Sequence, residues 1–185
     1  MNEQSCGAAS LCMVYHYYGL KHQTQEKIWT RLKKQRALIP NQESIYITDI
    51  YNDIRTNGLH TILGQAVWND SMKIFALLEE FLKIGVPIIV NQRWRENQPL
   101  GHFKVITGLN TEHIIVNDPE FTVNPTIIPY QKFISDWQNY SVETPGGWFV
   151  TALNEEQIKK IRILSVMEFR ADVKNFDISN LNFLP

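Results

Sequence analysis

The chain has 185 residues, a formal net charge of −1, 44% hydrophobic and 20% charged residues, five histidines and two cysteines. This length and composition fit one globular domain with a buried core, and the near-neutral charge argues against a nucleic-acid-binding surface. Two cysteines exclude a disulfide framework or a cysteine-based zinc module, so we expect free thiols in a reducing compartment.

Membrane and secretion signals are not found in the sequence. No apolar run approaches the roughly 18 residues that span a bilayer, and the N-terminus lacks the basic and apolar segments of a secretory signal. We therefore expect a cytoplasmic protein with no membrane span and no nucleic-acid partner. The oligomeric state stays open.

The first half of the chain has helical periodicity. Four helices are expected there, over residues 5–18, 24–36, 44–56 and about 70–84, with an extended piece at 59–66 before the last one. Ser5 is expected to cap the first helix and Gly19 to end it. Asn69 or Asp70 is expected to cap the fourth helix, and Gly85 closes it.

The second half changes to the short apolar runs of strands. Four strands are expected, over residues 86–91, 102–109, 113–117 and 148–153. Pro129 is expected in the first turn of a short helix, and Asn154 starts a C-terminal helix that reaches about Phe169. The last fifteen or so residues are predicted as a clasp or a loose tail. Helices first and an antiparallel sheet second predict an α+β fold.

Cys6 is the candidate nucleophile because it stands at the start of the first predicted helix. The partial positive charge there favours a thiolate, and the first backbone N–H groups of a helix can bind a developing oxyanion. Gly7 has no side chain, so a substrate carbonyl could approach beside it. The alternative is a cysteine at a helix end with no chemical role. Cys12 lies about 9 Å further along the helix and is expected to be a small core residue.

His102 is the best placed histidine for a general base. It opens a predicted strand after the loop 94–100, whereas His16 is about 15 Å from Cys6 along one helix. His22 and His60 are expected in polar turns, and His113 begins a strand at a surface position. Asp118 ends the next predicted strand, and an antiparallel hairpin brings that end beside the start of its partner. We expect the carboxylate to hold the imidazole. The alternatives are a structural histidine and a plain Asn-Asp-Pro turn.

Several short motifs resemble, in their order, those of the bacteriocin-processing cysteine peptidases. They are SCGAASL at 5–11 with YYG at 17–19, GVPIIV at 85–90, GHFKVITG at 101–108, IVNDP at 115–119, and Phe133 with Trp137. The resemblance covers about residues 5–153.

That resemblance implies a papain-like α+β fold, in which N-terminal helices pack against a C-terminal antiparallel sheet. It implies Cys6 as nucleophile, His102 as base and Asp118 as the residue that orients the base; papain's own group often has Asn in the third role. Residues 1–153 would form the peptidase domain, with the helix and tail of 154–185 packed on it.

One position departs from the family. The family usually supplies an oxyanion-hole glutamine six residues before the cysteine, and this chain begins five residues before it. Gln4, two positions before Cys6, is the nearest amide. Three interpretations stay open: the natural N-terminus is longer, Gln4 and the Cys6 backbone N–H form the oxyanion hole, or the site is impaired.

The expected function is a cysteine peptidase or amidohydrolase that cleaves a peptide or protein substrate through a thioacyl-enzyme. Two alternatives stay open: acyl transfer to an amine, as in a transglutaminase, and a degenerate domain that only binds peptide. No metal or organic cofactor is expected, because no residue grouping has zinc-ligand spacing. Trp94 and Gly101 are expected to border the substrate cleft with Gly7, although Trp94 could equally serve packing.

Overall fold

The structure is a computed structural model that describes residues 5–36, 44–66, 71–95, 101–121, 125–138, 146–163 and 173–177. These residues form six helices and seven strands. The helices are α1 (Cys6–Tyr17), α2 (Gln25–Arg36), α3 (Ile47–Thr56), α4 (Ser71–Lys83), α5 (Tyr130–Gln138) and α6 (Glu155–Ile163). The strands are β1 (His60–Ala66), β2 (Ile88–Arg93), β3 (Gly101–Leu109), β4 (His113–Asn117), β5 (Thr126–Pro129), β6 (Trp148–Leu153) and β7 (Val173–Asp177).

All seven strands belong to one antiparallel sheet in the order β5-β4-β3-β2-β6-β1-β7. The central strand β2 pairs with β3 on one side and with β6 on the other. Strands β3 and β4 form a hairpin whose register sets Val105 opposite Asn117. The open end of this hairpin therefore brings the beginning of β3 beside the end of β4.

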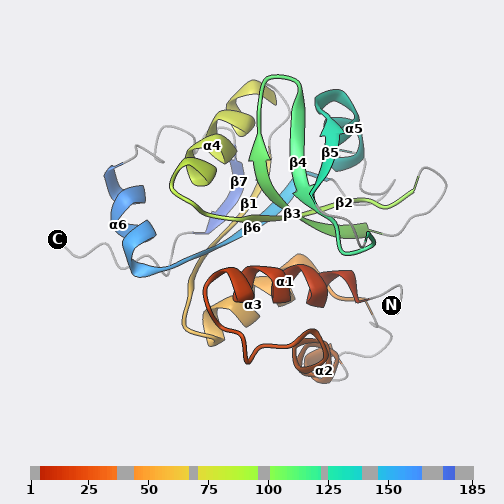
Figure 1. Ribbon diagram of the computed structural model, residues 1–185, viewed down its shortest axis with the longest axis vertical. Helices are drawn as coiled ribbons and strands as arrows, with labels where there is room; N and C mark the ends of the chain where they lie inside the picture. Colours follow the sequence, from red (N-terminus) through yellow and green to blue (C-terminus); the bar gives the residue numbers. More distant parts are fainter. Residues whose placement is uncertain are drawn as a thin grey trace.

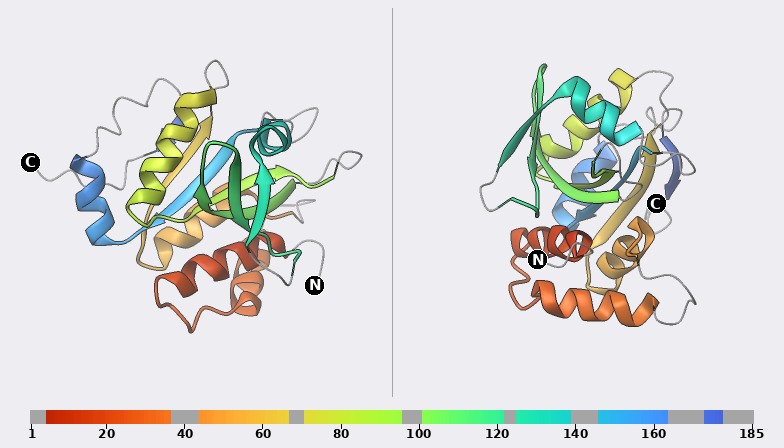
Figure 2. Two further views of the ribbon diagram at one scale, coloured as in Figure 1. Left: turned by 45° about the horizontal axis from the view of Figure 1, so that its top comes forward. Right: turned by 90° about the vertical axis from the view of Figure 1, so that its right-hand side faces the viewer.

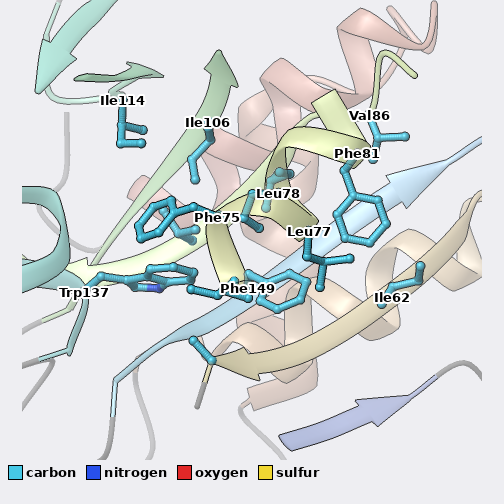
Figure 3. Close-up of a cluster of buried hydrophobic side chains, with 14 of the residues drawn as sticks. Ile62, Phe75, Leu77, Leu78, Phe81, Val86, Ile106, Ile114, Trp137 and Phe149 are labelled. Atoms are coloured by element: carbon cyan, nitrogen blue, oxygen red, sulfur yellow. The ribbon is translucent and has the colours of Figure 1, made fainter. Parts of the chain in front are cut away.

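Helices cover both faces of the sheet (Figure 1; Figure 2). Side chains alternate along the strands, so that Ile88 and Val90 join the core of α4 and α5, whereas Ile89 joins the core of α1, α2 and α3. Figure 3 shows the first of these cores, where aromatic and aliphatic side chains of α4 meet Trp137 and Phe149. The α+β, papain-like fold predicted from the sequence is confirmed, with a second helical layer added.

A buried carboxylate joins the three N-terminal helices. Asp53 of α3 is fully buried and accepts hydrogen bonds from Tyr15 Oη of α1 at 2.5 Å and from Arg31 Nε and Nη2 of α2 at 2.5 and 2.8 Å. Burial, together with the charge and hydrogen bond of Asp53, raises the pKa of the Tyr15 hydroxyl. This network fixes the position of α1, which carries Cys6 at its first residue.

Several predicted boundaries are wrong for local reasons. The third helix begins at Ile47 instead of Ser44, because Asp49 accepts a hydrogen bond from the Tyr46 N–H at 2.7 Å and caps the helix there. The strand predicted at 86–91 begins at Ile88. Val86 lies after the end of α4, and its N–H donates back to Phe81 O of that helix at 2.9 Å.

The last two differences concern strands that the sequence did not predict. Pro129 ends the edge strand β5 and does not begin a helix; α5 starts at the next residue. Strand β7 lies within the predicted clasp or tail and pairs with β1. Helix α6 ends at Ile163, and the rest of the stretch predicted to reach Phe169 lies outside the described residues, as do the predicted caps Asn69 and Asp70. Of the helices in the described ranges, none is long and apolar enough to cross a membrane.

Candidate active site

Cys6 lies half-buried at the first residue of α1. The hydrogen-bond ladder of the helix begins where the Ala9 N–H donates to Ser5 O at 2.9 Å. By helix geometry, the N–H groups of residues 6–8 have no acceptor within the helix, and their dipoles favour negative charge at the Cys6 thiol. Within the described residues, the Ser5 hydroxyl makes no capping bond; it accepts one from Gln25 Nε2 at 3.3 Å.

The structure brings His102 and Asp118 together at the open end of the β3–β4 hairpin. His102 Nε2 lies 2.6 Å from Asp118 Oδ1, and the two residues are 5% and 1% exposed. A carboxylate only accepts hydrogen bonds, so Nε2 carries a proton and donates it. Nδ1 is then the ring nitrogen that remains for a reacting group.

The Cys6 side chain lies close enough to His102 to act on the pKa of the imidazole. Figure 1 shows why this is so: the N-terminal end of α1 lies beside the beginning of β3. Burial by itself would lower the pKa of His102. The hydrogen bonds and charges of Asp118 and Cys6 outweigh burial and raise this pKa from 6.5 to about 9. The raised pKa favours the protonated imidazole near neutral pH.

Asp118 has a second cationic partner in Lys104. Lys104 Nζ lies 3.2 Å from Asp118 Oδ2, and the Lys104 side chain is only 14% exposed. The Glu120 N–H donates to Asp118 Oδ1 at 3.0 Å. Burial alone would raise the pKa of Asp118, but the hydrogen bond and charge of His102 and the charge of Lys104 lower it. Asp118 is thus a carboxylate fixed through both of its oxygens.

Trp94 and Glu120 complete the surroundings of the imidazole. The Trp94 ring stacks on His102, with centroids 6.1 Å apart. Trp94 Nε1 donates to Glu120 Oε2 at 2.8 Å, and Arg95 Nη2 lies 3.2 Å from Glu120 Oε1. The Trp94 hydrogen bond lowers the pKa of Glu120, with Arg95 adding to it. Trp94 therefore contacts the candidate base directly, in addition to any part it has in a substrate cleft.

The structure places the predicted site residues Gly101, Gly7 and Gln4 differently. Gly101 directly precedes His102 in β3. Gly7 is buried, and a Cβ atom built there would lie 3.2 Å from Ile45 Cγ2 and 3.2 Å from Phe103 Cδ2. Its missing side chain serves the close packing of α1 on β3, and its place beside a substrate stays a prediction. Gln4 lies outside the described residues, as do residues 96–100 of the predicted loop.

Two hollows lie on either side of the sheet. The larger, about 770 Å³, is bordered by α4, α5 and the β3–β4 turn, at the end of the hairpin away from His102. The smaller, about 140 Å³, lies between α1 and the sheet and includes Met13, Val105 and Asn117. Cys6, His102 and Asp118 line neither of these two hollows.

Three of the described residues could together hold a metal ion. Ligand atoms of His102, Asp118 and Glu120 lie within 4.8 Å of one another. The β3–β4 hairpin brings these three residues together, and their spacing in the sequence does not match a known metal-binding motif. Hydrogen bonds and ion pairs with Lys104 and Trp94 already account for these side chains, and we assign no metal to them.

Cys12 and the other histidines lie apart from this site. Cys12 Sγ donates to Gln23 O at 3.4 Å, and burial raises the pKa of the Cys12 thiol. His16 Nε2 lies 3.1 Å from the same carbonyl. His60, expected in a polar turn, pairs with Glu155 at 2.8 Å.

The family comparison is decisive for the class of protein. Residues 1–144 match the Peptidase_C39 like family. The chain belongs to this family. The match covers most of the chain and includes Cys6, His102 and Asp118. The predicted resemblance to bacteriocin-processing cysteine peptidases is thereby confirmed.

Individual relatives agree with this C39-like membership. A lactococcin transport/processing ATP-binding protein, LcnC-like, from Lactococcus lactis subsp. lactis (strain IL1403) is 25% identical over 142 residues, which are 77% of this chain and 18% of that protein. The chain thus spans about a fifth of the length of this relative.

Two solved structures share the C39-like fold. The peptidase domain of Streptococcus ComA, a bi-functional ABC transporter involved in a quorum-sensing pathway, has a TM-score of 0.60 at 21% identity, covering 83% of this chain and 95% of that one. A putative C39-like peptidase from Bacillus anthracis has a TM-score of 0.62 at 13% identity, covering 83% and 90%.

Sequence reasoning assigned no role to Lys104 or Glu120. A lysine inside a strand usually extends to solvent, so Lys104 gave no functional signal by itself. The available signal was the two-residue period of a strand, which sets Lys104 on the same face as His102. Glu120 lies two residues after Asp118, in a turn that the sequence pattern does not place against Trp94.

Proposed function

We propose that the chain is a cysteine peptidase that cleaves a peptide or protein substrate, with Cys6 as nucleophile, His102 as general acid and base, and Asp118 as the residue that orients His102. One observation carries the proposal: His102 Nε2 lies 2.6 Å from Asp118 Oδ1, and the α1 helix that begins at Cys6 packs on β3 so that Cys6 acts on the imidazole. Membership in a peptidase-like family supports it.

Acylation begins from the thiolate–imidazolium pair. The Cys6 thiolate attacks the substrate carbonyl carbon, a C–S bond forms, and the carbonyl electron pair moves to oxygen. The N–H groups at the start of α1 receive this oxyanion. His102 then gives its Nδ1 proton to the amide nitrogen, the C–N bond breaks, and the amine leaves a thioester on Cys6.

Deacylation uses the same groups in reverse. Neutral His102 takes a proton from water, whose oxygen attacks the thioester carbon. The tetrahedral intermediate collapses, the C–S bond breaks, and a carboxylic acid leaves. Cys6 returns to thiolate and His102 to imidazolium. Asp118 keeps its negative charge throughout and holds the Nε2 proton, so that Nδ1 is always the nitrogen that exchanges protons.

The test uses alkylation of the full chain with iodoacetamide at pH 6, followed by mass spectrometry of the Cys6 and Cys12 peptides. Cys12 is the internal control, because its thiol is protonated at that pH. We expect Cys6 to react at least about tenfold faster than Cys12, and His102→Ala to remove the difference. Equal rates in the wild-type chain would contradict an activated nucleophile and favour a domain that only binds peptide.

Hydrolysis is then tested with a mixed peptide library and chromatography coupled to mass spectrometry. We expect cleavage products from the wild-type chain and from Cys12→Ala, and none from Cys6→Ala. Glycine methyl ester added as an amine acceptor separates water from amine as the second substrate. Conjugates in place of free carboxylic acids would replace the peptidase assignment with acyl transfer.

A further inference from the structure

We propose that Lys104 is a positioning residue of the catalytic site. Lys104 binds Oδ2 of Asp118 and thereby keeps Oδ1 of Asp118 on His102. Because of this contact, the residue at position 118 must be a carboxylate. This inference rests on the proposed function, because it concerns how His102 is oriented. It goes beyond that function by adding a fourth residue to the site.

The hairpin places Lys104 in this position. Lys104 lies two residues after His102 in β3, so both side chains leave the same face of the strand. The β3–β4 ladder ends with Val105 opposite Asn117, and the residues just beyond this pair, Lys104 and Asp118, are in contact through their side chains. Lys104 Nζ is 3.2 Å from Asp118 Oδ2, while His102 Nε2 is 2.6 Å from Oδ1.

Burial makes this contact more than a surface ion pair. Asp118 is 1% exposed and the Lys104 side chain 14% exposed. The surface lysines Lys132 and Lys159 pair with acidic residues at similar distances but are 55% and 66% exposed. Water screens such surface pairs, whereas a buried charge that loses its partner is strongly destabilised.

The donors and acceptors of the cluster explain why a carboxylate is required. The Lys104 ammonium has only donors, and protonated Nε2 of His102 is also a donor. Two donors need two acceptor oxygens, which an aspartate offers. An asparagine at position 118 would offer one oxygen. If Lys104 took that oxygen, the amide NH2 would face His102 and force the tautomer in which Nδ1 carries the proton.

The Lys104 charge also moderates the basicity of His102. A single carboxylate shared by two cations stabilises each of them less than it would stabilise one. Among the described residues, the Glu120 carboxylate also acts on His102, and it is itself paired with Arg95. Lys104 is thus the cation that balances Asp118 when His102 becomes neutral during acylation.

A further pair lies beside the same strands. Arg93, opposite Gly101 in the β2–β3 register, has its guanidinium 3.5 Å from Asp136 on α5. Its charge is matched by that carboxylate, so Arg93 is already paired when Lys104 is removed.

The experiment is a double-mutant cycle on Lys104→Met and Asp118→Asn, read as the iodoacetamide rate of Cys6 at pH 6.5. In the wild-type background we expect Asp118→Asn to lower the rate on the order of 10²-fold, because the wrong tautomer is held. In the Lys104→Met background the same change should cost about tenfold or less, since one donor has been removed. In the Lys104→Arg background, which keeps a donor, Asp118→Asn should again cost on the order of 10²-fold.

Two controls keep the cycle interpretable. Circular dichroism at the assay temperature excludes unfolded variants, and Lys132→Met tests the loss of an ordinary surface charge. Equal cost of Asp118→Asn in both backgrounds, within about twofold, would overturn the role of Lys104. A wild-type Cys6 that reacts no faster than Cys12 would instead overturn the proposed function, so the two failures are distinguishable.

Discussion

The indole ring of Trp94 stacks on the imidazole of His102, with the ring planes inclined by 29°. Trp94 also donates a hydrogen bond to Glu120 through Nε1, and the Arg95 guanidinium lies over the indole ring, 4.3 Å from its centroid. These contacts hold the indole in place from two directions. Trp94 therefore covers one side of the hydrogen bond between His102 and Asp118, which is stronger when water is kept away from it.

Replacement of Trp94 should weaken the site without unfolding the chain. For Trp94→Ala we expect the Cys6 alkylation rate at pH 6.5 to fall by about tenfold, because water then competes for His102 and Asp118. Trp94→Phe keeps a ring on the imidazole and should stay within about threefold of the wild type. Trp29 on α2, whose ring centroid lies 5.4 Å from Lys33 Nζ, provides the matched control. Trp29→Leu should leave the rate unchanged. Equal effects of the alanine and phenylalanine variants would contradict a shielding role of the ring.

The second prediction concerns the buried carboxylate of Asp53. Asp53→Ala removes the acceptor for Tyr15 and Arg31 and leaves the buried Tyr15 hydroxyl without this partner, whereas the Arg31 side chain is 32% exposed. We expect the free energy of unfolding to fall by about 1–3 kcal/mol. Urea unfolding followed by circular dichroism measures the change.

An exposed pair provides the comparison for Asp53. Glu80 lies 2.9 Å from Lys83 near the end of α4, and both side chains are partly or well exposed. Glu80→Gln should cost less than about 1 kcal/mol. If both variants lose the same stability, Asp53 does not join the N-terminal helices in the way described.

Local pairing explains which parts of the site could be predicted from sequence. A short turn between two apolar runs predicts a hairpin, and a hairpin brings His102 beside Asp118 whatever the rest of the fold does. The contact between Cys6 and His102 depends on how α1 packs on the far side of the sheet. No local pattern contains that packing, so it was expected from family resemblance alone.

The missed strands have physical causes as well. β5 is a four-residue edge strand in which Ile127 is 62% exposed. It therefore lacks the alternation of buried apolar and exposed polar residues that predicts a strand. Proline at its last residue is compatible with an edge and with a helix start, and the sequence pattern does not distinguish the two. β7 gains its pairing from β1, a partner more than a hundred residues earlier in the chain.

The third prediction is the pH dependence of stability that His102 causes. Its pKa rises from 6.5 in an unfolded chain to about 9 in the folded one, so the folded state binds the proton more tightly. The resulting stabilisation is fully present below about pH 6.5 and is lost as the pH rises through about 9. Each unit of this difference corresponds to about 1.4 kcal/mol.

Thermal unfolding at pH 6.5 and pH 9.5 tests this sign. The wild-type chain should lose about 1–3 kcal/mol more than His102→Gln over this range, because the variant has no imidazole to titrate. Asp118 acts in the opposite direction: its pKa is lowered, so its contribution is lost only as the pH falls below about 4. A wild-type chain that is more stable at pH 9.5 relative to the variant would reverse the assignment.

The fourth prediction tests how closely α1 must approach β3. A methyl group at position 7 would lie 3.2 Å from Phe103 Cδ2, which is closer than ordinary van der Waals contact, so α1 must move away or Phe103 must turn. Gly7→Ala should therefore cost about 1 kcal/mol of stability and lower the Cys6 alkylation rate several-fold, because Cys6 moves with the helix relative to His102. Phe103→Leu makes room for the methyl group, so the double variant should recover part of the lost rate relative to Gly7→Ala. A Gly7→Ala chain with the wild-type rate would mean that the contact between Cys6 and His102 tolerates movement of α1, and that the glycine is needed only for packing.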